Sequence, residues 1–343
     1  MACVDMLRYK KDGLVTVKMS YFINQIPAIS DADQKFMVDM YVESRWDDDR
    51  LQSLSEEECL QGLREGKIWW PDVELIDGLE CNKESEHFYI TGASVIHWYR
   101  VKAWVSSSMD LRLFPCDFQT LRIRFESSSH DANELQLVSD VDGTVRCGKL
   151  LRTMHMLGEW RLHHVNHHAS DYKWEYDNIS YPYLQIDVVV VRQTGYYINR
   201  IGLTVALIWL MSFSVYLCDA DDIGNRLQVS ITLALTAVAF QFVALESLPR
   251  VPYMTLLDTY MSICFGTIAS SVLETCVVFR AHESEHWSDT DVAAIENFSL
   301  WANVFCFLAV SGWLLSKTRI SARDLPVEEV FAHKYHSYGS VVN

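Results

Sequence analysis

The sequence predicts a multi-domain membrane protein: an all-β domain with an immunoglobulin-like sandwich, followed by a bundle of four transmembrane helices. Two observations predict this fold class. Segments with strand-like alternation occupy the chain up to residue 192, and four long apolar segments follow Gly195. A change from a period of two residues to long apolar runs marks a change from half-buried strands to membrane-spanning helices.

The predicted strands begin at residue 14. Five segments alternate apolar and polar side chains or are rich in β-branched and aromatic residues: 14–23, 35–46, 94–105, 121–125 and 184–192. Such composition favours strands, and many short strands separated by turns indicate a two-sheet sandwich. One short helix is predicted at residues 55–64, because Ser55 can cap its first turn and Glu58 stands at the capping-box position.

Four apolar segments are long enough to cross the ~30 Å hydrocarbon core of a bilayer as helices. They cover residues 196–217, 226–247, 253–279 and 298–315. Trp301 and Trp313 lie in the last segment at depths where interfacial aromatic residues gather. Four spans return the chain to the side of the membrane on which it began, and a polar tail follows.

The second span, within Asn225–Ser247, carries polar residues along one face. Residues at spacings of 4, 3, 4, 3 and 4 fall on one side of a helix with ~3.6 residues per turn. They are Gln228, Thr232, Leu235, Ala239, Phe242 and Glu246. A stripe that faced lipid would hardly include Gln, Thr and Glu, so we expect it to line water between copies of the chain. A buried bundle helix with satisfied polar groups is the alternative.

Composition and motif spacing exclude several functions. The chain has 45 acidic and 29 basic residues and a net charge of −16, which argues against a nucleic-acid partner because such surfaces are basic. We find no nucleophile–base arrangement, phosphate loop or metal-ligand spacing, so we expect no enzyme, cofactor or metal. The histidines of residues 163–168 are too far apart along a strand to share an ion. Disulfides Cys59–Cys81 and Cys81–Cys147 remain open alternatives.

Several ordered motifs carry a family resemblance. Residues 109–119, the signature loop, read MDLRLFPCDFQ and resemble the loop that defines the pentameric ligand-gated ion channels, the Cys-loop receptor superfamily. The matching positions are Asp110, Phe114, Pro115, Asp117 and Gln119. Residues 46–51 resemble the family's W-x-D-x-R-L motif, and residues 248–253 resemble bacterial members.

The signature loop departs from the family in one respect. Its two cysteines would fall at Ser107 and Leu121, so this chain lacks the loop disulfide. Packing of Phe114 and Pro115 must therefore hold the loop, in place of ~3 kcal/mol of cross-link stabilisation. The chain resembles an invertebrate-type or orphan member of the family.

The resemblance implies a homopentamer in the plasma membrane with its N-terminal domain outside the cell. The expected domains are an extracellular ligand-binding sandwich (1–194), a transmembrane domain (195–316) and a C-terminal tail (317–343). A small-molecule agonist, expected to be a cationic amine, would bind between subunits and open a central pore to inorganic ions by a population shift. The lipid bilayer is the other expected partner.

In this family the agonist lies in a box of aromatic residues, whose ring faces attract cations. The resemblance implies two positions on the complementary face, three in the capping loop and two in the principal-face segment where a tryptophan is expected. These are Tyr41, Trp98, Trp174, Tyr176, Tyr181, Ser128 and His130. Because Ser128 replaces the tryptophan, the box is incomplete, and any single aromatic residue has core packing as its alternative role.

The resemblance also implies a region that couples ligand binding to the pore. Its residues are Asp31, Phe114, Pro115, Asp117, Arg192 and Pro249. Arg192 stands where the family has an arginine before the first span, and a charge so near the membrane needs an acidic partner. The candidates are Asp31, Asp33 and Asp117, and a solvated arginine is the alternative.

Ion selectivity is predicted from Asp222, Asn225 and Glu246, which flank the second span. Cation-selective relatives have glutamate where Asn225 stands, and anion-selective relatives have a Pro-Ala insertion that is absent here. Rings of acidic residues favour cations, and an apolar constriction at Leu235, Ala239 and Phe242 can close the pore by dewetting. We therefore expect a cation-selective channel. An anion-selective channel and a non-conducting subunit that needs a partner are the alternatives.

Overall fold

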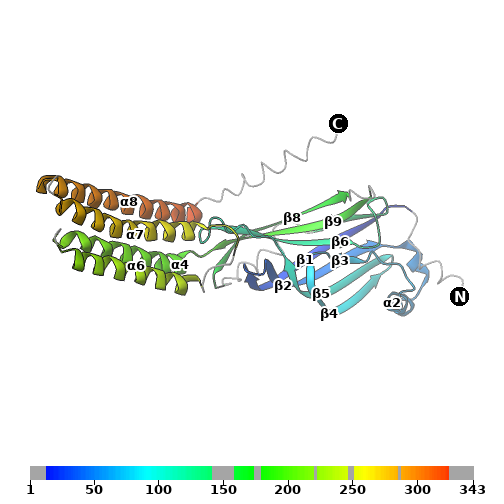
Figure 1. The fold of residues 1–343 in the computed structure, drawn as a ribbon. Helices are drawn as coiled ribbons and strands as arrows, with labels where there is room; N and C mark the ends of the chain where they lie inside the picture. Colours follow the sequence, from blue (N-terminus) through cyan, green and yellow to red (C-terminus); the bar gives the residue numbers. More distant parts are fainter. Residues whose placement is uncertain are drawn as a thin grey trace, which may run out of the picture. The chain divides into compact units, whose positions relative to one another are not determined.

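The protein is described by a computed structural model covering residues 13–140, 158–173, 179–219, 222–245, 251–284 and 287–323. The chain divides into two compact units, Met1–Met109 with Gln119–Val191 and Asp110–Phe118 with Arg192–Asn343. The first unit holds the strands and the second holds the long helices (Figure 1). The chain therefore passes between the units at residues 109–110, 118–119 and 191–192.

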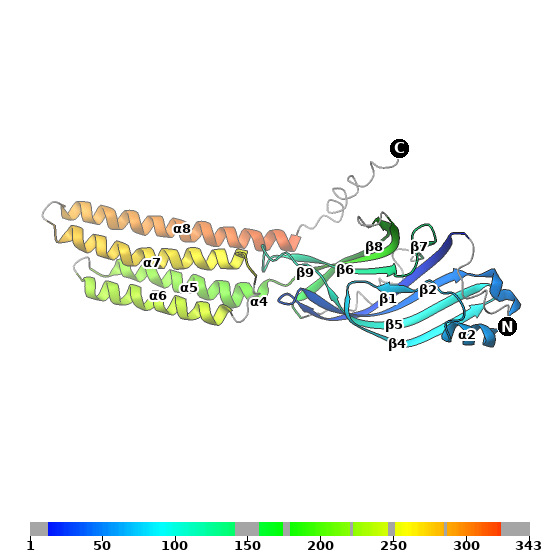
Figure 2. The ribbon, with the colours of Figure 1, turned by 45° about the vertical axis from the view of Figure 1, so that its right-hand side comes forward.

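The first unit is a sandwich of two sheets, visible from two directions in Figures 1 and 2. One sheet has the order β4 (Gly78–Thr91), β5 (Ser94–Ser106), β2 (Lys35–Asp47), β1 (Val15–Ser30) and β7 (Leu135–Ser139). The other has the order β3 (Val73–Leu75), β6 (Phe118–Ser127), β9 (Ser180–Arg192) and β8 (Trp160–Lys173). The five predicted strand segments are confirmed as β1, β2, β5, β6 and β9, whereas β3, β4, β7 and β8 were not predicted.

Alternation along each strand builds the core between the sheets. Even-numbered residues of β2 and odd-numbered residues of β5 point inward, because successive side chains leave opposite faces of a strand. The buried residues include Phe36, Val38, Met40, Val95, Val101, Leu121, Ile123, Phe125, Leu184 and Ile186. The odd-numbered residues of β2 and even-numbered residues of β5 therefore share the outer face of the five-stranded sheet.

A histidine is part of this interior. The His97 ring, from β5, stacks on Phe88 of β4 at 4.4 Å between centroids, and Tyr99 lies at 4.9 Å. Its Nε2 atom is 2.7 Å from a carboxylate oxygen of Glu86. Burial lowers the pKa of His97 below its ordinary value, although the bond to Glu86 opposes that effect.

The predicted short helix is confirmed as α2 (Glu56–Arg64), which follows the 3-10 helix η1 (Asp49–Ser53). The Ser55 hydroxyl accepts a bond from the Glu58 backbone, and the Glu58 carboxylate accepts one from the Ser55 backbone. The two residues therefore satisfy free donors at the first turn reciprocally, as their spacing predicts.

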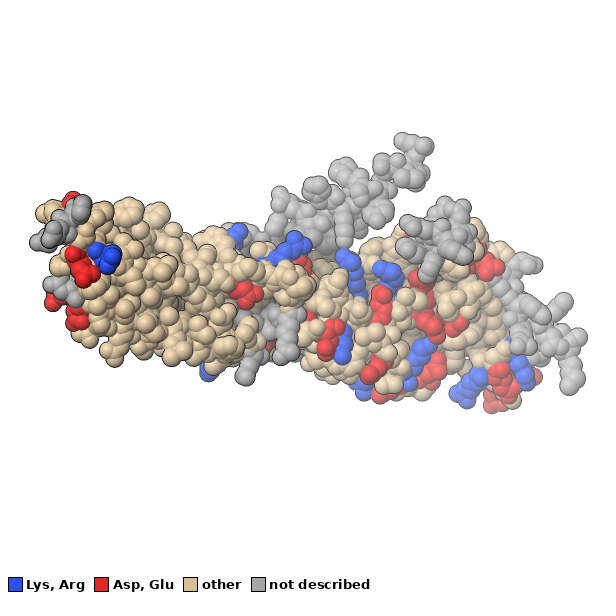
Figure 3. Space-filling model, in the orientation of Figure 1, with Lys and Arg blue, Asp and Glu red and all other residues tan. Residues whose placement is uncertain are grey.

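The second unit contains four helical segments that are long and apolar enough to cross a membrane. The first runs continuously through α4 (Gly195–Tyr197), the π-helix η2 (Ile198–Gly202), α5 (Leu203–Ser212) and the 3-10 helix η3 (Phe213–Leu217). The others are α6 (Ile223–Leu245), α7 (Leu256–His282) and α8 (Asp289–Arg323). Each expected span overlaps one of them, but α8 extends beyond both ends of residues 298–315. In Figure 3 a long stretch of this unit shows no charged residue on the visible face.

Candidate functional site

A buried ion pair joins the signature loop to the end of β9. The Arg192 Nε atom donates to Asp117 at 2.8 Å, and the two side chains are 0% and 2% exposed. The Arg192 backbone also donates to the Asp117 carbonyl at 3.2 Å, and its guanidinium lies over the Phe114 ring. Of the three candidate partners of Arg192, Asp117 pairs with it, and Asp33 pairs with Lys35 at 3.3 Å.

The signature loop is also bound to the helices of its own unit. The backbones of Leu256 and Leu257, at the start of α7, donate to the carbonyls of Arg112 and Phe114 at 2.9 and 3.2 Å. The fully buried Phe114 ring meets Tyr197 edge to face at 4.7 Å. Packing of Phe114 thus holds the loop in the absence of a disulfide. Pro249 lies outside the described residues, and the role of Asp31 in coupling stays a prediction.

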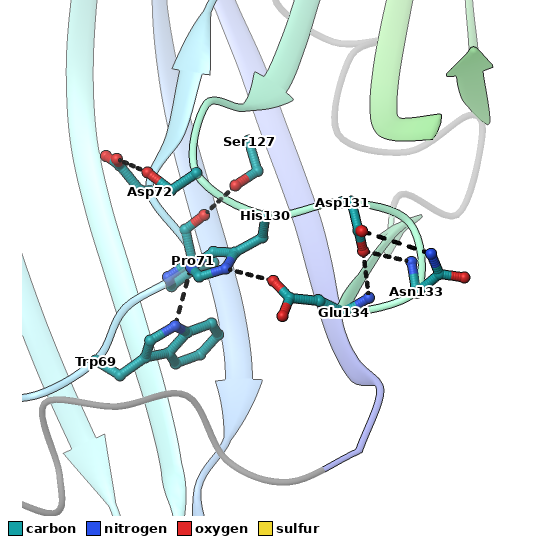
Figure 4. A network of polar contacts seen from close by, with 9 residues as sticks. Trp69, Pro71, Asp72, Ser127, His130, Asp131, Asn133 and Glu134 are labelled. Atoms are coloured by element: carbon teal, nitrogen blue, oxygen red, sulfur yellow. Dashed lines mark hydrogen bonds and ion pairs between the residues drawn. The ribbon is translucent and has the colours of Figure 1, made fainter. Parts of the chain in front are cut away.

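The segment that contains Ser128 and His130 packs against the loop at residues 69–72 (Figure 4). The hydroxyls of Ser128 and Ser129 both donate to the Asp72 carboxylate, at 3.1 and 2.9 Å. Asp72 itself has a φ of 46°, a left-handed conformation that is uncommon outside glycine. Ser128 therefore helps to hold a strained turn, a role that its alignment with a ligand-box tryptophan did not predict.

His130 has both ring nitrogens engaged, as Figure 4 shows. The Trp69 indole N–H donates to Nε2 at 2.9 Å, and Nδ1 lies 3.1 Å from the Glu134 carboxylate. Because an indole nitrogen can only donate, Nε2 must accept and Nδ1 must carry the proton. A ligand can therefore meet His130 through its ring without displacing a bond, but not through a free nitrogen.

Tyr41 and Trp98 lie together on the outer face of the five-stranded sheet. Their rings stack at 5.1 Å with an interplanar angle of 18°, and His87 stacks on Trp98 at 5.8 Å. The Arg100 guanidinium lies 5.5 Å from the centre of the Tyr41 ring. The structure brings the two predicted complementary-face residues into contact, and a cation of the chain itself already lies over one of them.

Arg100 is fixed by a carboxylate that the sequence analysis missed. Its Nε and terminal nitrogen donate to the two Asp39 carboxylate oxygens at 2.8 and 2.7 Å, and Asn24 donates to Asp39 at 2.8 Å. Arg100 holds the pKa of Asp39 below its ordinary value against the opposing effect of burial. An aspartate on the outward face of a strand gave no sequence signal that it would be 1% exposed.

The other predicted ligand residues are described only in part. Tyr181 is half-buried near the start of β9, whereas Trp174 and Tyr176 lie outside the described residues. Two residues on from Tyr181, the Tyr183 ring lies 5.5 Å from the Arg124 guanidinium and 5.9 Å from the His168 ring. Arg124 and Tyr183 were not predicted, since neither position matched a family motif.

Neither metal nor disulfide sites are found among the described residues. No group of three or more potential metal ligands occurs in that part of the chain. Within residues 163–168, the His163 and His164 rings contact each other, and His167 lies 3.1 Å from the Tyr21 hydroxyl. Cys59 and Cys81 are both free, so the Cys59–Cys81 alternative is wrong, and Cys147 lies outside the described residues.

Helix α6 has one buried face and one exposed face within a single chain. Its buried residues are Arg226, Ser230, Ala237 and Ala244. At about 100° per residue these lie about 160–200° from Gln228 around the helix axis. The five described members of the predicted stripe, Gln228, Thr232, Leu235, Ala239 and Phe242, are all exposed. The stripe is thus free to face other copies of the chain, and its pore-lining role stays a prediction.

At the beginning of α6, the predicted selectivity residues Asp222 and Asn225 are exposed, whereas the neighbouring Arg226 is buried. The Asn225 backbone donates to the Asp222 carboxylate at 3.1 Å, and both residues are exposed. Arg226 instead points into the bundle, where it donates to the Cys218 carbonyl at 3.1 and 2.6 Å and pairs with Glu296 at 2.5 Å. Glu246 lies outside the described residues.

Known proteins share this architecture. The family model of the neurotransmitter-gated ion-channel ligand binding domain matches residues 7–194, more than half of the chain. The chain belongs to the neurotransmitter-gated ion channels. The model of the transmembrane region of this family matches residues 203–311. Membership of this channel family and the four spans make the chain a multi-pass plasma-membrane protein with an extracellular ligand-binding domain, and not an enzyme.

A relative with a known ligand and ion is also similar. The glutamate-gated chloride channel of Drosophila melanogaster is 23% identical over 288 residues, which cover 80% of this chain and 60% of the relative. The chain thus spans about 60% of the length of that curated channel.

Proposed function

We propose that this member of the neurotransmitter-gated ion channels assembles as a homopentamer in which a small extracellular ligand opens a central pore. The observation that carries the proposal is the buried Asp117–Arg192 pair. Strand β6 begins one residue after Asp117, and β9 ends at Arg192. A ligand that favours one arrangement of these strands therefore acts directly on the pair, and so on the loop that is bound to α7.

Expression of the full chain alone in oocytes tests the proposal. Acetylcholine, glycine, γ-aminobutyrate, L-glutamate and a step in external pH are applied while current and surface protein are measured. We expect one of these stimuli to open a conductance. Surface protein that binds a compound without any current supports the non-conducting subunit instead. Surface protein with neither binding nor current contradicts the ligand-gated channel.

The agonist class follows from the charges near Tyr41. A cationic amine suits the aromatic residues Tyr41, Trp98 and Tyr181, because ring faces attract ammonium groups at ~0.5–2 kcal/mol per contact. Arg100 favours a second candidate, a ligand with a carboxylate, because its guanidinium has five N–H donors and the bonds to Asp39 use only two of them. The glutamate-gated relative supports this candidate. Arg100→Gln combined with Asp39→Asn, which leaves no unpaired buried carboxylate, separates the two: it weakens activation by L-glutamate strongly and activation by acetylcholine little, relative to Asp39→Asn alone.

Cation selectivity is supported by charges at the beginning of α6. Asp222 and Asn225 are exposed there, whereas the Arg226 guanidinium is buried. Five copies of an acidic residue favour cations at a pore mouth. The chloride selectivity of the Drosophila relative favours the alternative, an anion channel. Reversal potentials of Asn225→Glu and Glu246→Gln channels decide: we expect the first to raise and the second to lower relative cation permeability, and no change in either contradicts the acidic-ring account.

A further inference from the structure

A polar cluster lies inside the helix bundle of the second unit. Arg226 of α6 pairs with Glu296 of α8 at 2.5 Å, and the two side chains are 3% and 25% exposed. Asn303 of α8 donates to the Tyr216 hydroxyl at 2.9 Å, and the charges of Arg226 and Glu296 act on that tyrosine. Three helical segments thus meet around one guanidinium, far from the predicted ligand residues in the sequence.

Glu274 of α7 is a second carboxylate in this cluster. Both of its carboxylate oxygens are buried, and neither has a hydrogen-bond partner among the described residues. The charges of Arg226 and Glu296 act on it. A buried polar group without a partner is rare in native structures and calls for an explanation. An ionisable residue within a membrane-spanning helix is, by default, a candidate for function.

The geometry of α6 indicates what the two carboxylates do. Arg226 lies about 160° around the helix from Gln228, at the back of the exposed stripe. Asn225 lies only about 60° from Gln228, at its edge. An arginine side chain is long and flexible, so from a position next to Asn225 it can reach the edge of the stripe. Whether the Arg226 guanidinium lies inside the bundle or turns towards the pore mouth therefore depends on its acidic partner.

We propose that Glu296 and Glu274 are positioning residues for ion selectivity: they retain the Arg226 guanidinium inside the bundle and so keep five positive charges away from the inner mouth of the pore. Glu296 is the partner in the structure. Glu274 is the substitute acceptor when Glu296 is lost, because the charge of Arg226 already acts on it and its buried oxygens have no hydrogen-bond partner among the described residues. The inference rests on the proposed channel function for its electrical consequence only.

Reversal potentials test the proposal in full-length channels opened by L-glutamate or acetylcholine, whichever activates the wild type. We expect Glu274→Gln to change relative chloride permeability little and Glu296→Gln to raise it to an intermediate extent. In the double variant we expect a rise of about fivefold to tenfold, because five weakly screened positive charges at the pore mouth attract chloride. The matched control is Glu283→Gln, which removes an exposed carboxylate that pairs with Arg280 near the same end of the bundle.

Repeating the experiment in channels that lack Arg226 shows whether the effect of the glutamate substitutions depends on its guanidinium. In Arg226→Gln channels the double glutamate variant has no guanidinium to release, so we expect its effect on permeability to disappear. An equal rise with and without Arg226, or no rise in either, overturns the proposal. If the double variant does not reach the surface alone, co-assembly with wild-type subunits should give a graded rise.

A chemical readout separates this proposal from the channel proposal. Phenylglyoxal modifies accessible guanidinium groups, and peptide mass spectrometry reports its addition to Arg226 in purified full-length protein whether or not the pore conducts. We expect Arg226 to be protected in the wild type and in Glu283→Gln protein, and labelled several-fold faster in the double variant. Rapid labelling of wild-type Arg226, or unchanged protection in the double variant, contradicts the positioning role even if the chain is a channel.

Discussion

At the scale of single residues, two buried arginines of the helical unit pair with carboxylates that are distant in the sequence. Arg192 and Asp117 are both buried, and the buried Arg226 pairs with the partly buried Glu296. The sequence predicted that Arg192 needs an acidic partner, but it allowed three candidates because sequence spacing carries no distance across a fold. For Arg226 it predicted no partner at all, since Glu296 lies two spans further along the sequence and spacing does not show which helices touch.

Removal of Arg192 tests the cost of an unpaired buried charge. Arg192→Ala leaves the Asp117 carboxylate buried without its ion pair, which typically costs about 3–5 kcal/mol. We expect a large fall in thermal stability, measured by fluorescence-detected size exclusion of the full chain after heating. Arg200→Ala is the matched control, because Arg200 is exposed and near the same span. Equal melting of the two variants would show that the pair contributes little.

At the scale of elements, prediction succeeded where one pattern dominated and failed for strands that are very short, such as β3 and β7, or mostly exposed, such as β4. Strand β2 alternates along most of its length and was predicted, whereas β4 reads GLECNKESEHFYIT and is exposed along most of its length. Pairing with β5 through the backbone, not burial of an apolar face, holds β4 in place. A capping box predicted α2 because its two residues act locally, but no local signal could show that Ser128 would bind Asp72.

His97 of β5, whose ring stacks on Phe88 of β4, should make the stability of the folded chain depend on pH. Burial lowers its pKa, so between that value and the ordinary histidine pKa of ~6.5 the unfolded chain binds a proton that the folded chain does not. The free energy of unfolding is therefore unaffected by His97 above about pH 6.5 and decreases as the pH falls below that value. We expect His97→Gln to reduce the fall in melting temperature between pH 7.5 and 5, whereas the exposed His87→Gln should not. Parallel curves for the wild type and His97→Gln would refute this assignment.

The two faces of α6 can be compared with one kind of substitution. Leu235 is 68% exposed on the predicted pore stripe, whereas Leu233 lies about 160° away and is half-buried. Leu235→Thr should ease wetting of the closed pore and reduce the agonist concentration for half-maximal current on the order of tenfold, ~1.4 kcal/mol in the gating equilibrium. Leu233→Thr should not produce this gain. A similar gain in both variants would place the pore on another face.

At the scale of the whole molecule, the sequence predicted both units and their order, because strand alternation and continuous apolar runs are strong and separate signals. It did not predict that residues 110–118, which lie between two strands, belong to the helical unit. That grouping arises from backbone hydrogen bonds between distant residues, such as the bond from Leu256 to the Arg112 carbonyl. Neither the amino-acid composition nor the hydrophobic periodicity of the sequence indicates such bonds.

Assembly is testable at this scale. The exposed stripe of α6 and the outer face of the five-stranded sheet leave polar and aromatic residues for contact with other copies of the chain. Native mass spectrometry of the detergent-solubilised protein should therefore give a complex of about five times the 39.6 kDa chain mass. A stable monomer or dimer under conditions that preserve ligand binding would contradict the pentamer.

The link between α6 and α8 through Arg226 and Glu296 limits how this protein can be recombined. The outermost apolar helix of a bundle is an obvious segment to exchange between related receptors, because it contacts few other helices. Here such an exchange would separate a buried cation from its counter-charge unless the donor helix also had glutamate at the equivalent of Glu296. Chimeras should therefore take α6 and α8 from the same parent, or transfer the arginine and the glutamate together.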